Sequence, residues 1–178
     1  TPVFDGATEE QIEAELARAW IMDQAWKEAA ERAWEWLKEQ EYDANSIEDD
    51  DEVRRLYLEH WLDKRKYDVY SLNDPEYAHH ATAKEWLREK GYTNPDEILL
   101  EDRDVANKDP ELDEITVKAC LRLWMETNGV TRRVAEDKVI ETAQELAKEK
   151  GIPLPTLGKQ TLRDGKTESS NLGARTFT

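Results

Sequence analysis

The chain has 178 residues, a net charge of −16 and a pI near 4.6. Leu, Ile, Val and Phe supply only 34 of these residues, about 19%, and chains of high net charge below roughly 20% are usually disordered. Seven Trp and six Tyr compensate, since each can bury roughly 150–250 Å². We therefore predict a folded body whose core depends on aromatic side chains.

The acidic balance opposes direct binding to nucleic acid phosphates and to anionic lipids, because both are bound through Lys and Arg. No run of 18 apolar residues indicates a membrane span, and the first residues lack the pattern of a signal peptide. The single cysteine, Cys120, excludes an intrachain disulfide and a thiolate metal cluster. We expect a soluble intracellular protein, located in the cytoplasm or built into a virion.

The first predicted helix begins at a capping box. Thr8 is followed three residues later by Gln11, so each side chain can satisfy the backbone N–H of the other residue. Apolar residues then recur at spacings of three and four, which predicts a helix that ends near Tyr42. Its predicted buried stripe is Ile12, Leu16, Ala19, Met22, Trp26, Ala30, Ala33 and Leu37.

The apolar arc of this helix is wider than one neighbouring helix can cover. Trp20 and Trp34 lie on one side of the stripe and Trp36 on the other, so the arc spans roughly 200°. The helix is therefore central in a bundle, or it contacts another subunit. In the second case these three tryptophans are candidate partner-binding residues, because tryptophan is common at binding hot spots.

An acidic connection follows, with seven carboxylates and no basic residue between positions 41 and 52. It leads into a helix with Val53, Tyr57 and Trp61 on one face, and carboxylates favour the positive N-terminal end of a helix. The candidate acidic surface comprises Glu48, Asp49, Asp50, Asp51 and Glu52. Its charge would attract basic partners.

Proline and glycine mark the boundaries of the next helices. Pro75 opens a third helix that Gly91 closes. Pro95 opens a short helix around residues 98–100.

The last two predicted helices span residues 110–128 and 131–150, with Thr131 as the N-cap of the second. The link at Asn128 and Gly129 predicts that they pack antiparallel. All elements together predict an all-α fold, an irregular bundle of about five to six helices with a long N-terminal helix.

One helix-ending pattern recurs in residues 33–42, 83–92 and 143–152. Each copy has a charged Lys/Arg-Glu turn followed by an aromatic or aliphatic residue that folds back on the helix. Duplication and repeated use of one good helix end both explain the recurrence.

Residues 152–178 differ in character from residues 1–151, which we predict to be one acidic helical domain. Three Gly and two Pro among Ser, Thr and Asn leave no helical or strand period in this segment. It carries a charge of +2, against −18 for the rest of the chain, so we predict an extended tail that contacts its own body or a neighbour's. Its candidate partner-binding residues are Leu157, Leu162, Leu172 and Phe177.

No residue pattern identifies a reaction or a cofactor. Carboxylates are so abundant that no pair stands out as an acid–base couple. The three histidines, His60, His79 and His80, lack the spacing that places two imidazoles on one helical face. We therefore predict no catalytic residue, no metal site, no cofactor and no small-molecule substrate.

The sequence favours a non-catalytic structural, assembly or adaptor protein that acts through protein partners or as a homo-oligomer. A subunit of a larger assembly, such as a virion, fits this description. The alternative is an acidic regulator that inhibits a basic protein by mimicking nucleic acid. An enzyme with an unrecognised carboxylate site is a third class.

Overall fold

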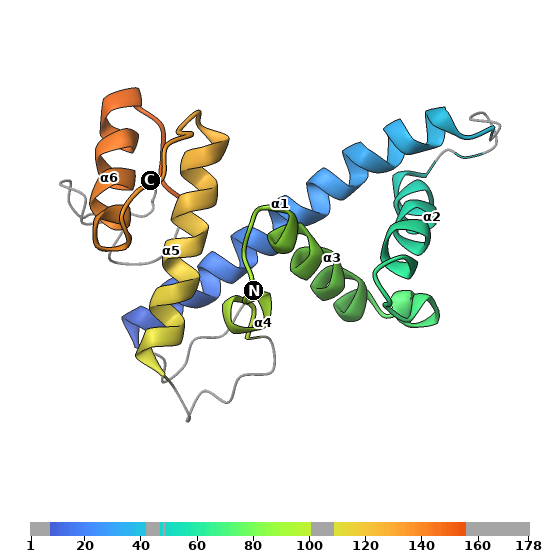
Figure 1. The fold of residues 1–178 in the computed structure, drawn as a ribbon, viewed down its shortest axis with the longest axis horizontal. Helices are drawn as coiled ribbons and strands as arrows, with labels where there is room; N and C mark the ends of the chain where they lie inside the picture. The colour runs from blue at the N-terminus through green and yellow to red at the C-terminus, as the bar shows by residue number, and fades with distance from the viewer. Residues whose placement is uncertain (1–7, 42–46, 48, 101–108, 156–178) are drawn as a thin grey trace. The chain divides into compact units, whose positions relative to one another are not determined.

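The computed structural model describes residues 8–41, 47, 49–100 and 109–155. Within these ranges the chain forms six α-helices, two short 3₁₀ helices and no strand, which confirms the all-α prediction and the long N-terminal helix (Figure 1). None of these helices is long and apolar enough to cross a membrane. The elements are α1 (Glu9–Glu39), α2 (Asp50–Asp63), η2 (Val69–Asn73), α3 (Pro75–Glu89), α4 (Pro95–Ile98), α5 (Pro110–Thr127), η3 (Glu136–Lys138) and α6 (Val139–Lys150).

The chain divides into two compact units, and helix α1 contributes to both. Unit 1 comprises residues 1–20 and 97–178, which include the start of α1, α5, η3 and α6. Unit 2 comprises residues 21–96, which include the rest of α1 with α2, η2 and α3. Most of the predicted tail lies outside the described residues, and so do Leu157, Leu162, Leu172 and Phe177.

Side chains cap the first turns of the long helices. The predicted capping box is confirmed: the backbone N–H of Thr8 donates to Gln11 Oε1 (2.7 Å), and that of Gln11 donates to Thr8 Oγ1 (3.2 Å). Asp49, Asp74 and Asp109 cap α2, α3 and α5 by accepting from the backbone N–H two residues further on. The predicted starts at Pro75 and Pro110 are therefore confirmed, whereas α2 begins at Asp50, inside the predicted acidic connection.

Helices α3, α5 and α6 end in the same backbone motif, with a glycine of positive φ one or two residues after the last helical residue. Beyond each glycine, a backbone N–H donates to the carbonyl five residues earlier, as from Tyr92 to Leu87 and from Ile152 to Ala147. Two of the three predicted helix-ending patterns are thus confirmed. Tyr42 of the first pattern lies outside the described residues.

Helix α2 ends in the same motif without a glycine. The N–H of Tyr67 donates to the carbonyl of Leu62, and the N–H of Lys66 donates to that of Asp63, both at 3.1 Å. Lys66 takes the left-handed conformation, with φ 68°, that glycine occupies in the other helices. This conformation is unfavourable for a residue that has a β-carbon.

The buried line of α1 consists mostly of alanine. The predicted stripe is wrong, because it lies about one residue position away from this line around the helix axis. Of the predicted residues only Ala33 and Leu37 are buried, Ala19 is exposed, and the others are half-buried. The prediction followed the largest side chains, whereas small side chains occupy the line of closest helix packing. That line is Ala14, Ala17, Ile21, Ala25, Ala29, Ala33 and Leu37.

Two helices cover the wide apolar arc of α1 in unit 2 (Figure 1). The ring of Trp26 lies 3.8 Å from that of His79 in α3, and the ring of Trp36 lies 5.3 Å from that of His60 in α2. This part of α1 is therefore the central helix of a small bundle, one of the two arrangements that the wide arc predicts.

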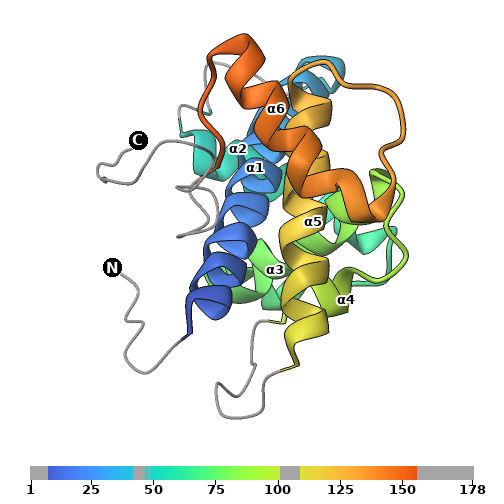
Figure 2. The same cartoon turned by 90° about the vertical axis from the view of Figure 1, so that its left-hand side faces the viewer.

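Helices α5 and α6 of unit 1 pack together, but the antiparallel prediction is wrong. Lys150, which ends α6, donates from Nζ to the carbonyl of Asn128 at the end of α5 (2.9 Å). Glu136, just before α6, pairs with Arg122 inside α5 (3.0 Å). The two helices therefore run in the same general direction (Figure 2), because the connection over residues 129–138 is long enough to return along α5.

The start of α6 also differs from the prediction, since the helix begins at Val139 rather than at Thr131. Its buried line starts at Val139 and repeats every four residues. A helix extended backwards at 100° per residue would place Arg132 on this line and Val134 on the opposite side. The non-helical segment instead buries Val134 and leaves Arg132 exposed, which removes both conflicts.

We expect Lys66→Gly to stabilise the chain by about 1 kcal/mol, because glycine adopts the left-handed conformation without the steric cost of a β-carbon. Thermal unfolding followed by circular dichroism should show a Tm higher by roughly 2–4 °C. Lys66→Ala is the matched control, since it keeps the β-carbon and should leave the Tm unchanged. An equal rise in both variants would trace the effect to the lysine side chain instead.

Candidate functional site

A buried ion pair fixes the interior of unit 1. Arg18 Nη2 lies 3.5 Å from Asp113 Oδ1, and both side chains are less than a tenth exposed. Arg18 also donates from Nε to the carbonyl of Ile98 (3.1 Å) and from Nη1 to Glu15 (2.5 Å). The hydroxyl of Thr116 donates to the same Ile98 carbonyl (2.9 Å). These contacts set the register of α1 against α4 and α5.

Unit 1 also contains a small, mainly apolar hollow between the start of α1, α5 and α6, with a cavity volume of about 10 Å³. Leu154, from the segment after α6, forms one wall, and the last described residue, Pro155, is buried. Glu13 is only 4% exposed and brings a carboxylate to the lining. The complete lining is Glu13, Val117, Leu121, Ile140, Ala143, Gln144 and Leu154.

A half-buried apolar stripe of α1 runs beside this hollow. Ile12, Leu16 and Trp20 recur every four residues, and each side chain remains partly exposed. Leu16 follows Glu13 by three residues, so these two side chains are neighbours on the helix surface. We call the three stripe residues together with the lining of the hollow the unit 1 face.

In unit 2, arginines from three parts of the chain surround two glutamates of α3. Arg65 lies 3.6 Å from Glu85 and 3.7 Å from Glu89, and Arg32 of α1 lies 2.6 Å from Glu89. Arg88 pairs with Glu85, which is itself 6% exposed. This network joins α1, the end of α2 and α3.

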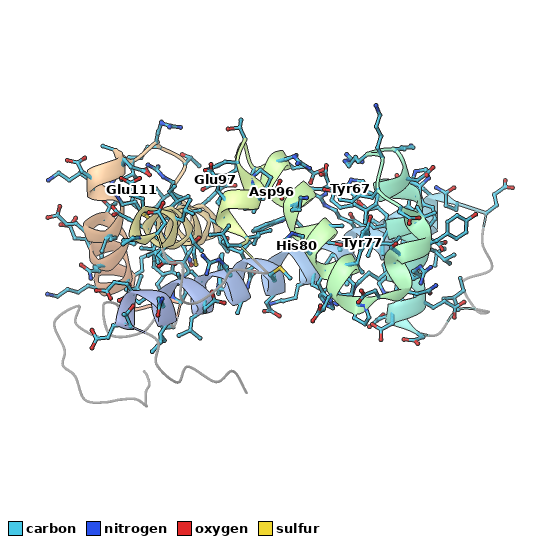
Figure 3. All side chains as sticks on the ribbon, turned by 90° about the horizontal axis from the view of Figure 1, so that it is seen from below. Tyr67, Tyr77, His80, Asp96, Glu97 and Glu111 are labelled. Carbon is cyan, nitrogen blue, oxygen red and sulfur yellow. The ribbon has the colours of Figure 1, made fainter. Side chains whose placement is uncertain are left out.

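Aromatic rings complete this network. The guanidinium of Arg65 lies 4.7 Å from the centre of the Trp61 ring, a cation–π distance. Tyr67 donates its hydroxyl hydrogen to Glu85 Oε2 (2.7 Å), and its ring lies 6.4 Å from that of Tyr77 (Figure 3). Burial, reinforced by the hydrogen bond to Glu85, raises the pKa of Tyr67 to about 12.

A second small hollow, with a cavity volume of about 10 Å³, lies within unit 2 between α1, α2 and α3. Trp61 and Trp86 form part of its lining, and Arg32 lies at the same site. The indole N–H of Trp86 is buried and has no hydrogen-bond partner among the described residues. The arrangement suits a bridging water more than a larger ligand, because the rings and Arg32 already fill most of the space.

The structure does not bring the three candidate tryptophans together. Trp34 donates its indole N–H to Asp50 Oδ1 (2.6 Å), and Trp36 packs on His60, so both contact α2 within unit 2. Trp20 belongs to unit 1 and is half-buried. Partner binding by all three stays a prediction.

The candidate acidic surface lies at the start of α2, and Glu48 is outside the described residues. Asp49 serves as the N-cap, Asp50 accepts from Trp34, and Asp51 lies 3.3 Å from Arg54. The four described members are all exposed: Asp49, Asp50, Asp51 and Glu52. Three of these four carboxylates therefore also have a role in the local structure.

The described part of the chain holds no group of three His, Cys, Asp or Glu side chains that could bind a metal ion. Cys120 is fully buried in α5, and burial raises the pKa of its thiol.

Sequence reasoning missed the Arg18–Asp113 pair, although one signal was present. Arg18 follows Ala14 by four residues and precedes Ile21 by three, so it shares the buried side of α1 with them. A charged residue in this position requires a buried partner. The spacing of large apolar residues indicates a different side of α1 as the buried one, so it does not place Arg18 in the interior.

We expect Arg18→Met to cost about 3–5 kcal/mol in the free energy of unfolding, because it leaves the carboxylate of Asp113 buried without this cation. Urea unfolding measures the loss. Arg32→Met is the control, since its ion pair with Glu89 is about a third exposed and should contribute about 1 kcal/mol or less. Equal costs for the two variants would contradict the importance of the buried pair.

The raised pKa of Tyr67 predicts a loss of stability at high pH. A tyrosine in an unfolded chain ionises near pH 10, so protonated Tyr67 stabilises the folded state below pH 10, and this stabilisation is lost as the pH rises through about 12. Urea unfolding from about pH 9, one unit below the unfolded pKa, to about pH 12, the folded pKa, measures this loss. The free energy of unfolding should decline more steeply with pH for the wild type than for Tyr67→Phe. Parallel declines would refute the assignment.

Comparison with protein-family models, with curated proteins and with solved structures finds no match for this chain.

Proposed function

We propose that this chain is a non-catalytic assembly or adaptor protein that binds other proteins, or copies of itself, through the unit 1 face. The observation that carries the proposal is the partly exposed stripe of Ile12, Leu16 and Trp20 beside an apolar hollow. A partner that covered these side chains would remove their remaining apolar surface from water, at roughly 25 cal/mol per Å². Trp20 is the expected hot spot of this contact.

The charge of the chain indicates the chemistry of the partner surface. A body of strongly negative charge associates most readily with a surface that carries basic residues around an apolar anchor. A subunit of a larger assembly, such as a virion, or an adaptor in the cytoplasm would use the face in this way.

A second candidate function is an acidic regulator that binds a basic protein in place of nucleic acid. The exposed carboxylates of Asp49, Asp51 and Glu52 at the start of α2 favour it. Such binding depends on charge and weakens steeply with salt, since the Debye length falls to about 3 Å at 1 M.

We expect Trp20→Ala to weaken association at least about tenfold with little change in Tm, because a partly exposed hot-spot side chain contributes more to binding than to folding. Light scattering against concentration measures self-association, at physiological salt and at about 1 M salt. Trp36→Ala is the matched control: it removes the contact with His60, so it should lower the Tm and leave association unchanged.

Self-association that persists at high salt supports the apolar face, whereas binding to added polylysine that is lost at high salt supports the acidic regulator. If the wild type stays monomeric, a photo-cross-linking residue at position 20, compared with one at exposed position 63, tests for other partners. The absence of a specific cross-linked complex at position 20 would refute the proposal.

A further inference from the structure

We propose that the turn after α2 in one copy of this chain binds the unit 1 face of a second copy, so that copies join head to tail. This inference rests on the proposed function of that face and names its partner. We call residues 64–70 the basic turn. It carries a charge of +2, whereas the whole chain carries −16.

The basic turn presents two lysines to solvent. Lys64 and Lys66 are exposed, and neither side chain forms an ion pair within the part of the chain that the structure describes. Arg65 between them differs, because it lies near the carboxylates of Glu85 and Glu89. The two lysines are therefore available to carboxylates of another molecule.

Tyr70 adds an aromatic side chain to these cations. It is 84% exposed, and among the described residues it is the one large hydrophobic side chain that is exposed. Lys66 and Tyr70 are four residues apart, so their Cα atoms lie within about 14 Å of each other. Tyrosine is common at binding hot spots, so the turn has the composition of an interface: an aromatic anchor beside charged groups.

Contacts within unit 2 hold the backbone of the basic turn in place. Arg65 donates to the carbonyl of Trp61 (2.9 Å), and Tyr67 donates its hydroxyl hydrogen to Glu85 (2.7 Å). Asp68 is the N-cap of η2, which follows directly. The exposed side chains thus project from a fixed turn, and binding a fixed turn costs less conformational entropy than ordering a flexible loop.

The backbone conformation of Lys66 is a separate observation that points to the same turn. Its φ of 68° is unfavourable for a residue that has a β-carbon, and α3, α5 and α6 use glycine at this point of the motif. Residues held in such conformations cluster at sites of binding and catalysis. Glycine would keep the turn but remove one cation, so a binding role for the side chain gives a reason for lysine here.

The unit 1 face has the complementary chemistry. Glu9 lies three residues before Ile12 and Glu15 lies three residues after it, so exposed carboxylates flank the apolar stripe. Glu15 shares Arg18 with Asp113, and these three side chains together carry a charge of −1. The tyrosine of the basic turn can therefore pack on the stripe while its lysines pair with the flanking carboxylates.

Two different surfaces meet in this contact, so each bound pair keeps one free surface of each kind. Contacts of this type produce rings if the rotation between copies closes, and filaments if it does not. The negative charge of the whole chain opposes association, but the Debye length of about 8 Å at physiological salt limits this repulsion to groups near the contact. The complementary charges of the turn and the face therefore determine which surfaces meet.

Variants of the basic turn test the contact by light scattering against concentration. We expect Tyr70→Ala to weaken self-association at least about tenfold. Lys64→Glu/Lys66→Glu should have a similar effect at physiological salt and lose most of it at about 1 M salt, where the Debye length is about 3 Å. Lys27→Glu/Lys38→Glu is the matched control, since it changes the charge equally at two exposed positions of α1, and it should leave association unchanged.

Lys66→Gly separates the side chain from the backbone of the turn. It should raise the Tm and yet weaken association about two- to fivefold, the contribution of one exposed ion pair. An unfolded turn cannot produce this combination, because a loss of structure would lower the Tm. Unchanged association in both Lys66→Gly and the double lysine variant would overturn the proposal.

A mixture of two defective variants tests the head-to-tail arrangement. Trp20→Ala keeps the basic turn and Tyr70→Ala keeps the unit 1 face, so an equimolar mixture should form pairs that grow no further. Light scattering should give a mass near that of two chains for the mixture and of one chain for each variant alone. A mixture that stays monomeric at concentrations where the wild type associates would overturn the proposal.

The two proposals fail separately. If Trp20→Ala weakens association and Tyr70→Ala does not, the face is used and the basic turn is not its partner. If Tyr70→Ala weakens association and Trp20→Ala does not, the proposed face is refuted, and this contact with it. A wild type that is monomeric at every concentration overturns the contact between copies, and cross-linking at position 20 then decides the proposed function.

Discussion

The line of small side chains along α1 is the constraint on which both units depend. Alanine at positions 25, 29 and 33 faces α2 and α3 in unit 2, and Ala14 and Ala17 take the same role in unit 1. Small residues leave the larger aromatic side chains no place on the buried line, so tryptophan is displaced to the flanks of the helix. There Trp34 and Trp36 join α1 to α2, whereas Trp20 stays partly exposed and forms the edge of the unit 1 face.

The two units use polar groups in different ways. Unit 1 buries the ion pair of Arg18 with Asp113. Removal of either partner leaves the other charge buried and unpaired, which is strongly destabilising. The geometry of the pair also specifies one register of α1 against α5. Unit 2 places its arginines at the margin, where Arg65 and Arg32 cover Trp61 and pair with Glu89. Apolar surface that would otherwise meet water is shielded by side chains that remain hydrated at their tips.

Local features of the fold could be predicted from the sequence, and features set by packing could not. Asp109 before Pro110, or Gly151 after a charged turn, specifies a helix boundary through bonds a few residues apart. The buried line of α1, the direction of α6 and its start at Val139 depend on which neighbour each face meets. The unit 1 face was predicted only through Trp20, because the hollow combines α1, α5 and α6, and no spacing in the sequence indicates that these segments meet.

The order of the units along the chain has a consequence for synthesis on the ribosome. Unit 2 is continuous, so its core can close while α5 is still being translated. Unit 1 is interrupted by unit 2, and Arg18, which can pair at once with nearby Glu15, must wait for Asp113, about 95 positions later, before its buried ion pair forms. The first turns of α1 thus emerge well before α5 and α6, and their acidic and apolar surface stays without these partners until unit 2 has been translated.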